Sequence, residues 1–310
     1  MDAFTGTVKP LLQPLTAKSL TIHGLVKDYS GKAAALRMPR EISHLRQWYT
    51  AAVSYESEPK DLSPPDSPSI LSPDSHLDLH LHVGEVLRDG ESHTIYRVCH
   101  GVSHEPSEAA YSFPPMVIKV SAELEGQHLA EEAAMYDYLH SLQGVVIPHC
   151  YGYFRCFVNL LEHVVIPWAP ECTFPRDKKT INMFRMPNQM ASLNVLLLED
   201  VGEPLPLYST PQQLKELEQD LFDMSKELCQ LQVDYTDWEC SNIVRAYEQP
   251  KAIAGLPSSR NNRTYKYRII DFETACTTEA IRPEAIHKRC RSFYNEIIAK
   301  VRNSSIQFMG

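Results

Sequence analysis

The segment Tyr235–Val244 reads Y-T-D-W-E-C-S-N-I-V, and the segment Ile269–Glu273 reads I-I-D-F-E. Each places an aspartate where a strand meets a loop: Asp237 comes five residues before Asn242, and Asp271 directly follows a β-branched pair. A chemistry that holds a divalent metal on a polyphosphate and orients a hydroxyl nucleophile needs such a set. It requires one carboxylate to accept a proton and two oxygen ligands for Mg²⁺. The two segments together supply these groups.

The two segments resemble the catalytic loop H-R-D-x-x-x-x-N and the D-F-G motif of protein kinases, most closely those of divergent fungal kinase-like proteins. Upstream, Lys119 ends a β-branched run that resembles the strand of the phosphate-binding lysine. Glu132 falls where its partner glutamate would lie on the next helix. Residues 195–202 resemble the last strand of the N-lobe and the hinge, in which Glu199 and Val201 would contact the nucleotide.

This resemblance implies ATP and Mg²⁺ as cofactors and gives each residue a role. Lys119 would bind the α- and β-phosphates, and Glu132 would orient it. Asp271 and Asn242 would hold Mg²⁺, and Asp237 would accept the proton of the acceptor hydroxyl. The structural alternatives stay open: an edge-strand lysine that reaches water, and an Asx turn at the Asp237 loop.

A β-hairpin is predicted upstream because apolar and polar residues alternate in segments 77–83 and 94–98. In a kinase this hairpin covers the phosphates, so Gly90 would contact the nucleotide. The turn departs from G-x-G-x-x-G, and Asp89 and Glu91 flank its tip. Fewer glycines allow less close backbone approach, and carboxylates repel phosphate. An ordinary surface hairpin therefore remains the alternative.

Other departures leave the acceptor open. Tyr235 and Thr236 stand where the family has histidine and arginine, which suggests regulation without a phosphorylated activation loop. Glu273 replaces a glycine, which restricts the backbone and adds a carboxylate near the metal. Only 37 residues follow Glu273, too few for a complete lower lobe. The prediction is an ATP-dependent kinase of protein serine/threonine type. Its alternatives are a small-molecule kinase of the aminoglycoside or choline type, or a nucleotide-binding pseudokinase scaffold.

The expected fold is α+β and two-lobed, with a reduced helical C-lobe. Residues 1–76 are assigned to an N-terminal extension that ends in a linker rich in Pro, Ser and Asp, with a short amphipathic helix at 37–52. Residues 77–202 are assigned to the N-lobe, with an insertion near 156–192. Residues 203–310 are assigned to the C-lobe.

Three longer helices are predicted, over residues 123–142, 211–232 and 283–301. The second has the clearest signals, because Thr210 and Gln213 form a capping-box pattern and leucines recur every three or four residues. We expect it to be a buried helix that holds the Asp237 loop in place, with a coiled-coil seam as the alternative.

Composition excludes several functional classes. The 310 residues are 43% apolar and carry a net charge of −9, which disfavours nucleic-acid binding. No apolar run is long enough to cross a bilayer, and the first residues lack the pattern of a signal peptide. The eight cysteines form no C-x-x-C pair, so reduced thiols are expected. These features predict a cytoplasmic or nuclear protein that binds ATP and a hydroxyl-bearing acceptor, either a protein or a small molecule.

Overall fold

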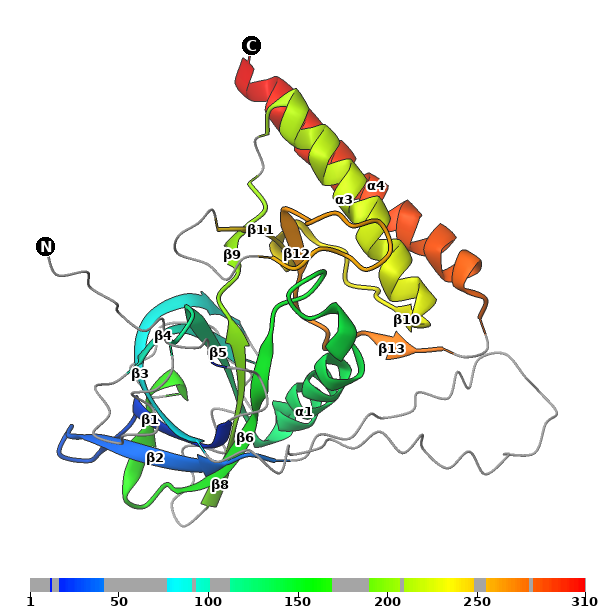
Figure 1. The fold of residues 1–310 in the computed structure, drawn as a ribbon. Helices are drawn as coiled ribbons and strands as arrows, with labels where there is room; N and C mark the ends of the chain where they lie inside the picture. Colours follow the sequence, from blue (N-terminus) through cyan, green and yellow to red (C-terminus); the bar gives the residue numbers. More distant parts are fainter. Residues whose placement is uncertain are drawn as a thin grey trace, which may run out of the picture. The chain divides into compact units, whose positions relative to one another are not determined.

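The computed structural model describes most of the chain. The described residues are 12, 17–41, 77–90, 93–100, 112–168, 190–206, 209–247, 255–278 and 281–309. They divide into two compact units. Unit 1 holds the described residues up to Glu41, from Leu77 to Leu129 and from Cys150 to Asp200, and unit 2 holds the others. The protein is α+β, with an extended sheet in unit 1 and long helices in unit 2 (Figure 1).

Unit 1 is built on one eight-stranded sheet that curls into a nearly closed barrel (Figure 1). Its strand order is β2-β1-β3-β4-β5-β8-β6, with β7 paired to β1. The strands are β1 (Ala17–Asp28), β2 (Ala33–Pro39), β3 (Leu77–Asp89), β4 (His93–His100), β5 (Met116–Ala122), β6 (Cys150–Asn159), β7 (His163–Val165) and β8 (Met190–Glu199). Beyond β2, Arg40 forms a bridge with Phe154, so the two ends of the sheet meet.

The barrel follows from alternation in its strands. Leu77, Leu79 and Leu81 of β3 are fully buried in the core of unit 1. The residues between them point to the other face of the sheet, because successive strand side chains alternate. The predicted hairpin is confirmed, since β3 and β4 pair antiparallel with Val83 opposite Val98.

Strands β1 and β2 were not predicted, although β1 alternates apolar and polar residues as a half-buried strand does. The prediction for residues 1–76 rested on the Pro, Ser and Asp content of their second half, which β1 and β2 do not share. Residues 42–76 lie outside the described part. The helix predicted from residue 37 is wrong at its start, because residues 37–39 belong to β2. Within the predicted insertion at 156–192, residues 156–168 continue β6 and form β7 and a 3₁₀ turn at Ile166–Trp168. Residues 169–189 of that insertion lie outside the described residues.

Unit 2 combines two long helices with short strands. Helix α1 (Glu123–Tyr138) begins in unit 1 and ends in unit 2. The elements wholly in unit 2 are a 3₁₀ turn at His140–Leu142, β9 (Gly202–Pro204), α3 (Pro211–Gln230), β10 (Val233–Asp234), a 3₁₀ turn at Cys240–Asn242, β11 (Ile243–Ala246), β12 (Tyr267–Ile269), β13 (Cys276–Thr277) and α4 (Pro283–Met309). Strands β12, β11 and β9 form one small sheet, and β10 pairs with β13.

Helix α3 has the predicted capping box. The N–H of Gln213 donates to Thr210 Oγ1 at 3.3 Å, and the N–H of Thr210 donates to the Gln213 side chain at 2.9 Å. Its apolar stripe is buried against α4, which runs antiparallel beside it (Figure 1). The prediction of a buried helix is therefore confirmed, and its partner is the C-terminal helix. No helix in the described part of the chain is long and apolar enough to cross a membrane.

Acid should weaken the contact between α3 and α4 through His287. Burial lowers the pKa of His287 below 6.5, and the cations Lys226 and Arg291 lower it further. The folded state then binds fewer protons than the unfolded state, so stability falls as the pH drops through 6.5 toward the folded pKa. We expect His287→Gln to lose less thermal stability than the wild type over this range, measured by melting at stepped pH. The control is His140→Gln, which changes an exposed histidine and should follow the wild type. If the melting temperature of His287→Gln falls with pH as steeply as that of the wild type, the prediction is wrong.

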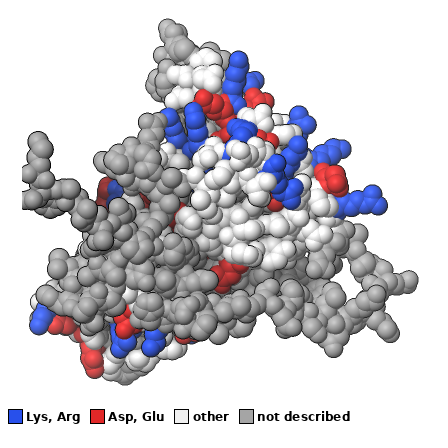
Figure 2. Space-filling view, in the orientation of Figure 1, with Lys and Arg blue, Asp and Glu red and all other residues white. Residues whose placement is uncertain are grey.

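Charges on the helical surface are mixed. Figure 2 shows Lys and Arg side chains, with Asp and Glu among them, over the region where α3 and α4 lie in Figure 1. The exposed cations of α4 are Lys288, Arg289, Arg291, Lys300 and Arg302. Acidic residues on the same helices interrupt this set, so the surface lacks the unbroken basic stripe that favours phosphate backbones.

Candidate functional site

A strand pair in unit 2 brings the two acidic segments together. Ile243 of β11 lies opposite Ile269 of β12, so the residues before β11 lie beside those after β12. The N–H of Ile270 donates to the carbonyl of Asn242 at 3.0 Å and extends this pairing. The loop that carries Asp271 therefore lies next to Asn242.

Asn242 is bonded directly to Asp237. Its side-chain amide donates to Asp237 Oδ2 at 2.7 Å and to the Asp237 main-chain carbonyl at 3.2 Å. Asn242 is 1% exposed, whereas Asp237 is half-buried. The amide nitrogen thus orients the carboxylate, and the amide oxygen is the group suited to a cation. The N–H of Glu239 turns this loop by donating to the main-chain carbonyl of Asp237 at 2.9 Å.

Asp271 has an unusual backbone conformation. Its φ is +65°, in the left-handed region that residues other than glycine seldom adopt. Bonds on both sides hold it there: the Tyr235 hydroxyl donates to the Ile270 carbonyl at 2.8 Å, and the Phe272 N–H donates to Glu132 Oε1 at 3.2 Å. Backbone strain that neighbouring groups maintain in this way is typical of functional sites.

Glu132 reaches the Asp271 loop from α1. It is 1% exposed, whereas the neighbouring Glu131 is half-buried, so Glu132 is the inward-facing member of the pair. Lys119 lies in unit 1 on β5, between Ile95 of β4 and Leu196 of β8, and is 3% exposed. The alternative that Lys119 is an edge-strand lysine extending into water is therefore wrong.

Aromatic rings in edge-to-face and tilted contacts connect the elements around the site. The Phe272 ring lies 5.4 Å from Tyr136 of α1 and 5.1 Å from Tyr235. Tyr235 lies 5.2 Å from Trp238, which lies 5.9 Å from Tyr294 of α4. Such offset and edge-to-face contacts stabilise one mutual arrangement of rings. They hold the Asp237 and Asp271 loops against the same buried column.

Carboxylates concentrate negative charge around this column. Burial raises the pKa of Tyr235 well above 10.0, and the charges of Asp271, Asp237 and Glu132 raise it further. These carboxylates act on one buried phenol, so a cation nearby would offset the negative charge around it. A carboxylate at Asp271 and an amide oxygen at Asn242 suit a hard cation such as Mg²⁺.

The described residues hold no group of three His, Cys, Asp or Glu side chains arranged to bind a metal alone. This is compatible with a Mg²⁺ ion that takes one or two protein ligands and completes its coordination with phosphate and water. The fit of Asp271 and Asn242 therefore depends on a bound polyphosphate.

Beside Lys119, three nucleotide contacts were predicted: Gly90, Glu199 and Val201. In unit 1, the N–H of Gly90 donates to the His93 carbonyl at 2.9 Å, so this amide is already bonded within its turn. Glu199, also in unit 1, is buried at the end of β8. In unit 2, the carbonyl of Val201 accepts from the N–H of Tyr247 at 3.0 Å.

Helix α4 supplies contacts to the Asp237 loop that the sequence did not indicate. Arg289 forms an ion pair with Asp234, directly before the loop, and the Cys290 thiol donates to the Tyr235 carbonyl at 3.9 Å. The one sign of this contact in the sequence was the acidic residue Asp234, directly before Tyr235. Its partner is 55 residues away in the sequence and could not be paired without the fold.

At the level of class, the chain is an α+β protein with a barrel-like sheet in one unit and a helical unit that joins two acidic loops. Searches against protein-family models and against curated proteins found no match for the chain.

Proposed function

We propose that the protein transfers a phosphoryl group from ATP to a hydroxyl acceptor, as a protein serine/threonine kinase-like enzyme. The observation that carries this proposal is the bonded Asp237–Asn242 pair, which the β11–β12 ladder joins to Asp271. This arrangement supports the proposal, because Asp237 is a half-buried carboxylate and Asn242 and Asp271 carry oxygens of the kind that Mg²⁺ prefers.

Each residue then has a defined task. Asp237 accepts the proton of the acceptor hydroxyl, and Asn242 orients it through the 2.7 Å bond. Asp271 and Asn242 would hold Mg²⁺, whose charge would stabilise the phosphate oxygens when it is bound with ATP. Glu132 holds the Asp271 loop through the Phe272 N–H. For Lys119 we retain the phosphate-binding role that the resemblance implies.

A second function keeps specific support. The engaged N–H of Gly90 and the presence of Glu273 favour a nucleotide-binding scaffold without transfer activity.

Binding of Mg-ATP tests the proposal first. Ligand at 100 times its Kd should stabilise the wild type by about 2.7 kcal/mol, seen as a rise in melting temperature. Asp271→Asn should remove the part of this rise that depends on Mg²⁺, because the side chain that would hold the metal ion loses its negative charge. The matched control is Glu239→Gln, which changes an exposed carboxylate on the Asp237 loop and should keep the full shift. A wild type that shows no shift at any Mg²⁺ concentration would overturn the proposed site.

A further inference from the structure

Three histidines lie together on the outer face of the barrel in unit 1. On β3, His80 and His82 are separated by Leu81, and Leu79 precedes His80. Both leucines are buried in the core, so both histidines point to the opposite face of the sheet. His23 lies on the neighbouring parallel strand β1, directly opposite His82. Two ligands at alternate strand positions and a third on the adjacent strand place three imidazoles on one small surface.

The imidazoles are already in contact. The ring centres of His23 and His82 are 4.6 Å apart and those of His23 and His80 are 6.1 Å apart, with nearly parallel planes. His82 is exposed, and His23 and His80 are half-buried. A cross-strand stack of this kind stabilises a sheet by itself, so the stack alone does not define a site.

The ligand chemistry points to a transition metal. Imidazole nitrogen suits Zn²⁺, Ni²⁺ and Cu²⁺, whereas Mg²⁺ prefers oxygen. Three histidines are a common protein ligand set for zinc, with metal–nitrogen distances of about 2.0–2.1 Å and a fourth position open. As the rings stand, they are stacked and do not converge on one point, in agreement with the lack of a preformed metal cluster among the described residues. Binding therefore requires the rings to turn about their side-chain torsions.

We propose that His23, His80 and His82 bind one divalent transition-metal ion of the Zn²⁺ type on the outer face of the barrel. The metal connects β1 to β3. This parallel pairing joins the β1–β2 hairpin to the rest of the sheet, together with the β1–β7 pairing and the bridge from Arg40 to Phe154. The site shares no residue with the proposed phosphoryl-transfer site, and it uses nitrogen ligands where that site uses oxygen ligands. Its role is to stabilise the closed barrel.

Titration with Zn²⁺ by calorimetry tests this in a Cys99→Ser background, because Cys99 is an exposed thiol opposite His82. We expect one ion to bind with micromolar affinity, Mg²⁺ not to compete, and Zn²⁺ to raise the melting temperature. Loss of a residue that merely supports a metal ligand costs about 10- to 100-fold in affinity. His80→Ala combined with His82→Ala should therefore weaken binding at least about 100-fold. The matched control, His140→Ala, changes an exposed histidine outside the cluster and should bind as the parent does.

A second measurement does not depend on the variants folding. In the Cys99→Ser protein with its histidines intact, Zn²⁺ should protect His23, His80 and His82, but not His140, from acylation by diethyl pyrocarbonate, mapped by peptide mass. Equal modification with and without Zn²⁺, or Zn²⁺ binding that is unchanged in the double variant, would mean adventitious binding only and would overturn the proposal. Melting temperatures in EDTA verify that each variant folds.

Discussion

Asp237→Ala is expected to transfer phosphoryl groups at least about 10²-fold more slowly than the wild type, the usual contribution of a positioned general base. The affinity for Mg-ATP should stay nearly unchanged, because Asp237 is assigned to the acceptor and not to the metal. The transfer rate is measured as the initial rate of ADP formation with a hydroxyl acceptor such as casein. The affinity for Mg-ATP is measured separately, from the shift in melting temperature.

The alanine variant also leaves the buried amide of Asn242 without its carboxylate partner, which costs stability in its own right. Asp237→Asn is the better matched change, since its amide oxygen can still accept from Asn242 but cannot act as the base. Both variants should transfer phosphoryl groups at least about 10²-fold more slowly than the wild type, and only the alanine variant should melt clearly lower. Wild-type rates in Asp237→Asn would remove Asp237 from the mechanism, whereas a wild type that binds Mg-ATP but forms no ADP would favour the scaffold function.

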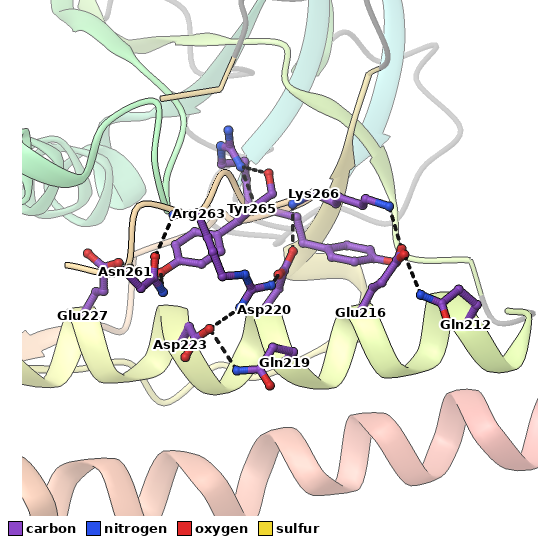
Figure 3. Close-up of polar contacts among 12 residues, drawn as sticks. Gln212, Glu216, Gln219, Asp220, Asp223, Glu227, Asn261, Arg263, Tyr265 and Lys266 are labelled. Carbon is purple, nitrogen blue, oxygen red and sulfur yellow. Dashed lines mark hydrogen bonds and ion pairs between the residues drawn. The ribbon is translucent and has the colours of Figure 1, made fainter. Parts of the chain in front are cut away.

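Asp220→Ala is expected to lower the free energy of unfolding by about 2–3 kcal/mol, a large share of the roughly 5–15 kcal/mol typical of a folded protein. Asp220 is 2% exposed on α3, where it accepts from Arg263 and from the main-chain N–H of Lys266, both at 2.7 Å (Figure 3). Burial raises the pKa of Asp220, and these two donors offset part of the rise. Removing the carboxylate takes this acceptor from the Lys266 N–H and leaves Arg263 with its pair to Asp223, next to the start of β12.

Urea denaturation measures the free energy of unfolding of each variant. Two neighbouring acidic residues of α3 provide graded controls for this prediction. Asp223 also pairs with Arg263 but is more exposed, so Asp223→Ala should cost less than Asp220→Ala. Glu218 is exposed on the same helix, and Glu218→Ala should be close to neutral. If Asp220→Ala costs no more than Glu218→Ala, the network in Figure 3 does not hold the segment that leads into β12.

This network has a consequence for the candidate site. The segment after residue 255 leads into β12, and β12 leads directly to Asp271. Tyr265 in this segment donates to Glu227 of α3 at 2.6 Å, and Lys266 pairs with Glu216 at 2.8 Å (Figure 3). The acidic face of α3 therefore determines where β12 begins and, through it, where the Asp271 loop lies.

Local patterns in the sequence were sufficient for several elements. The capping box and leucine spacing predicted α3, because both signals act within a few residues of the helix. Alternation predicted the β3–β4 hairpin, and the β-branched pair before Asp271 predicted the end of β12. The same reasoning missed β1 and β2, because the segment that follows them differs strongly in composition and was grouped with them.

For the candidate site, the sequence alone determined which residue types are present and their spacing within each loop: Asp237 with Asn242, and Asp271 after its strand. It also determined the alternation on β3, which places the leucines on one face of the sheet and the histidines on the other. Tertiary structure decided which loops meet, because the bonds from Tyr235 to Ile270 and from Glu132 to Phe272 join residues 35 and 140 positions apart. It also decided that β1 lies beside β3, so that His23 faces His82. Contacts between distant segments depend on how the whole chain buries its apolar surface, and no local pattern encodes that outcome.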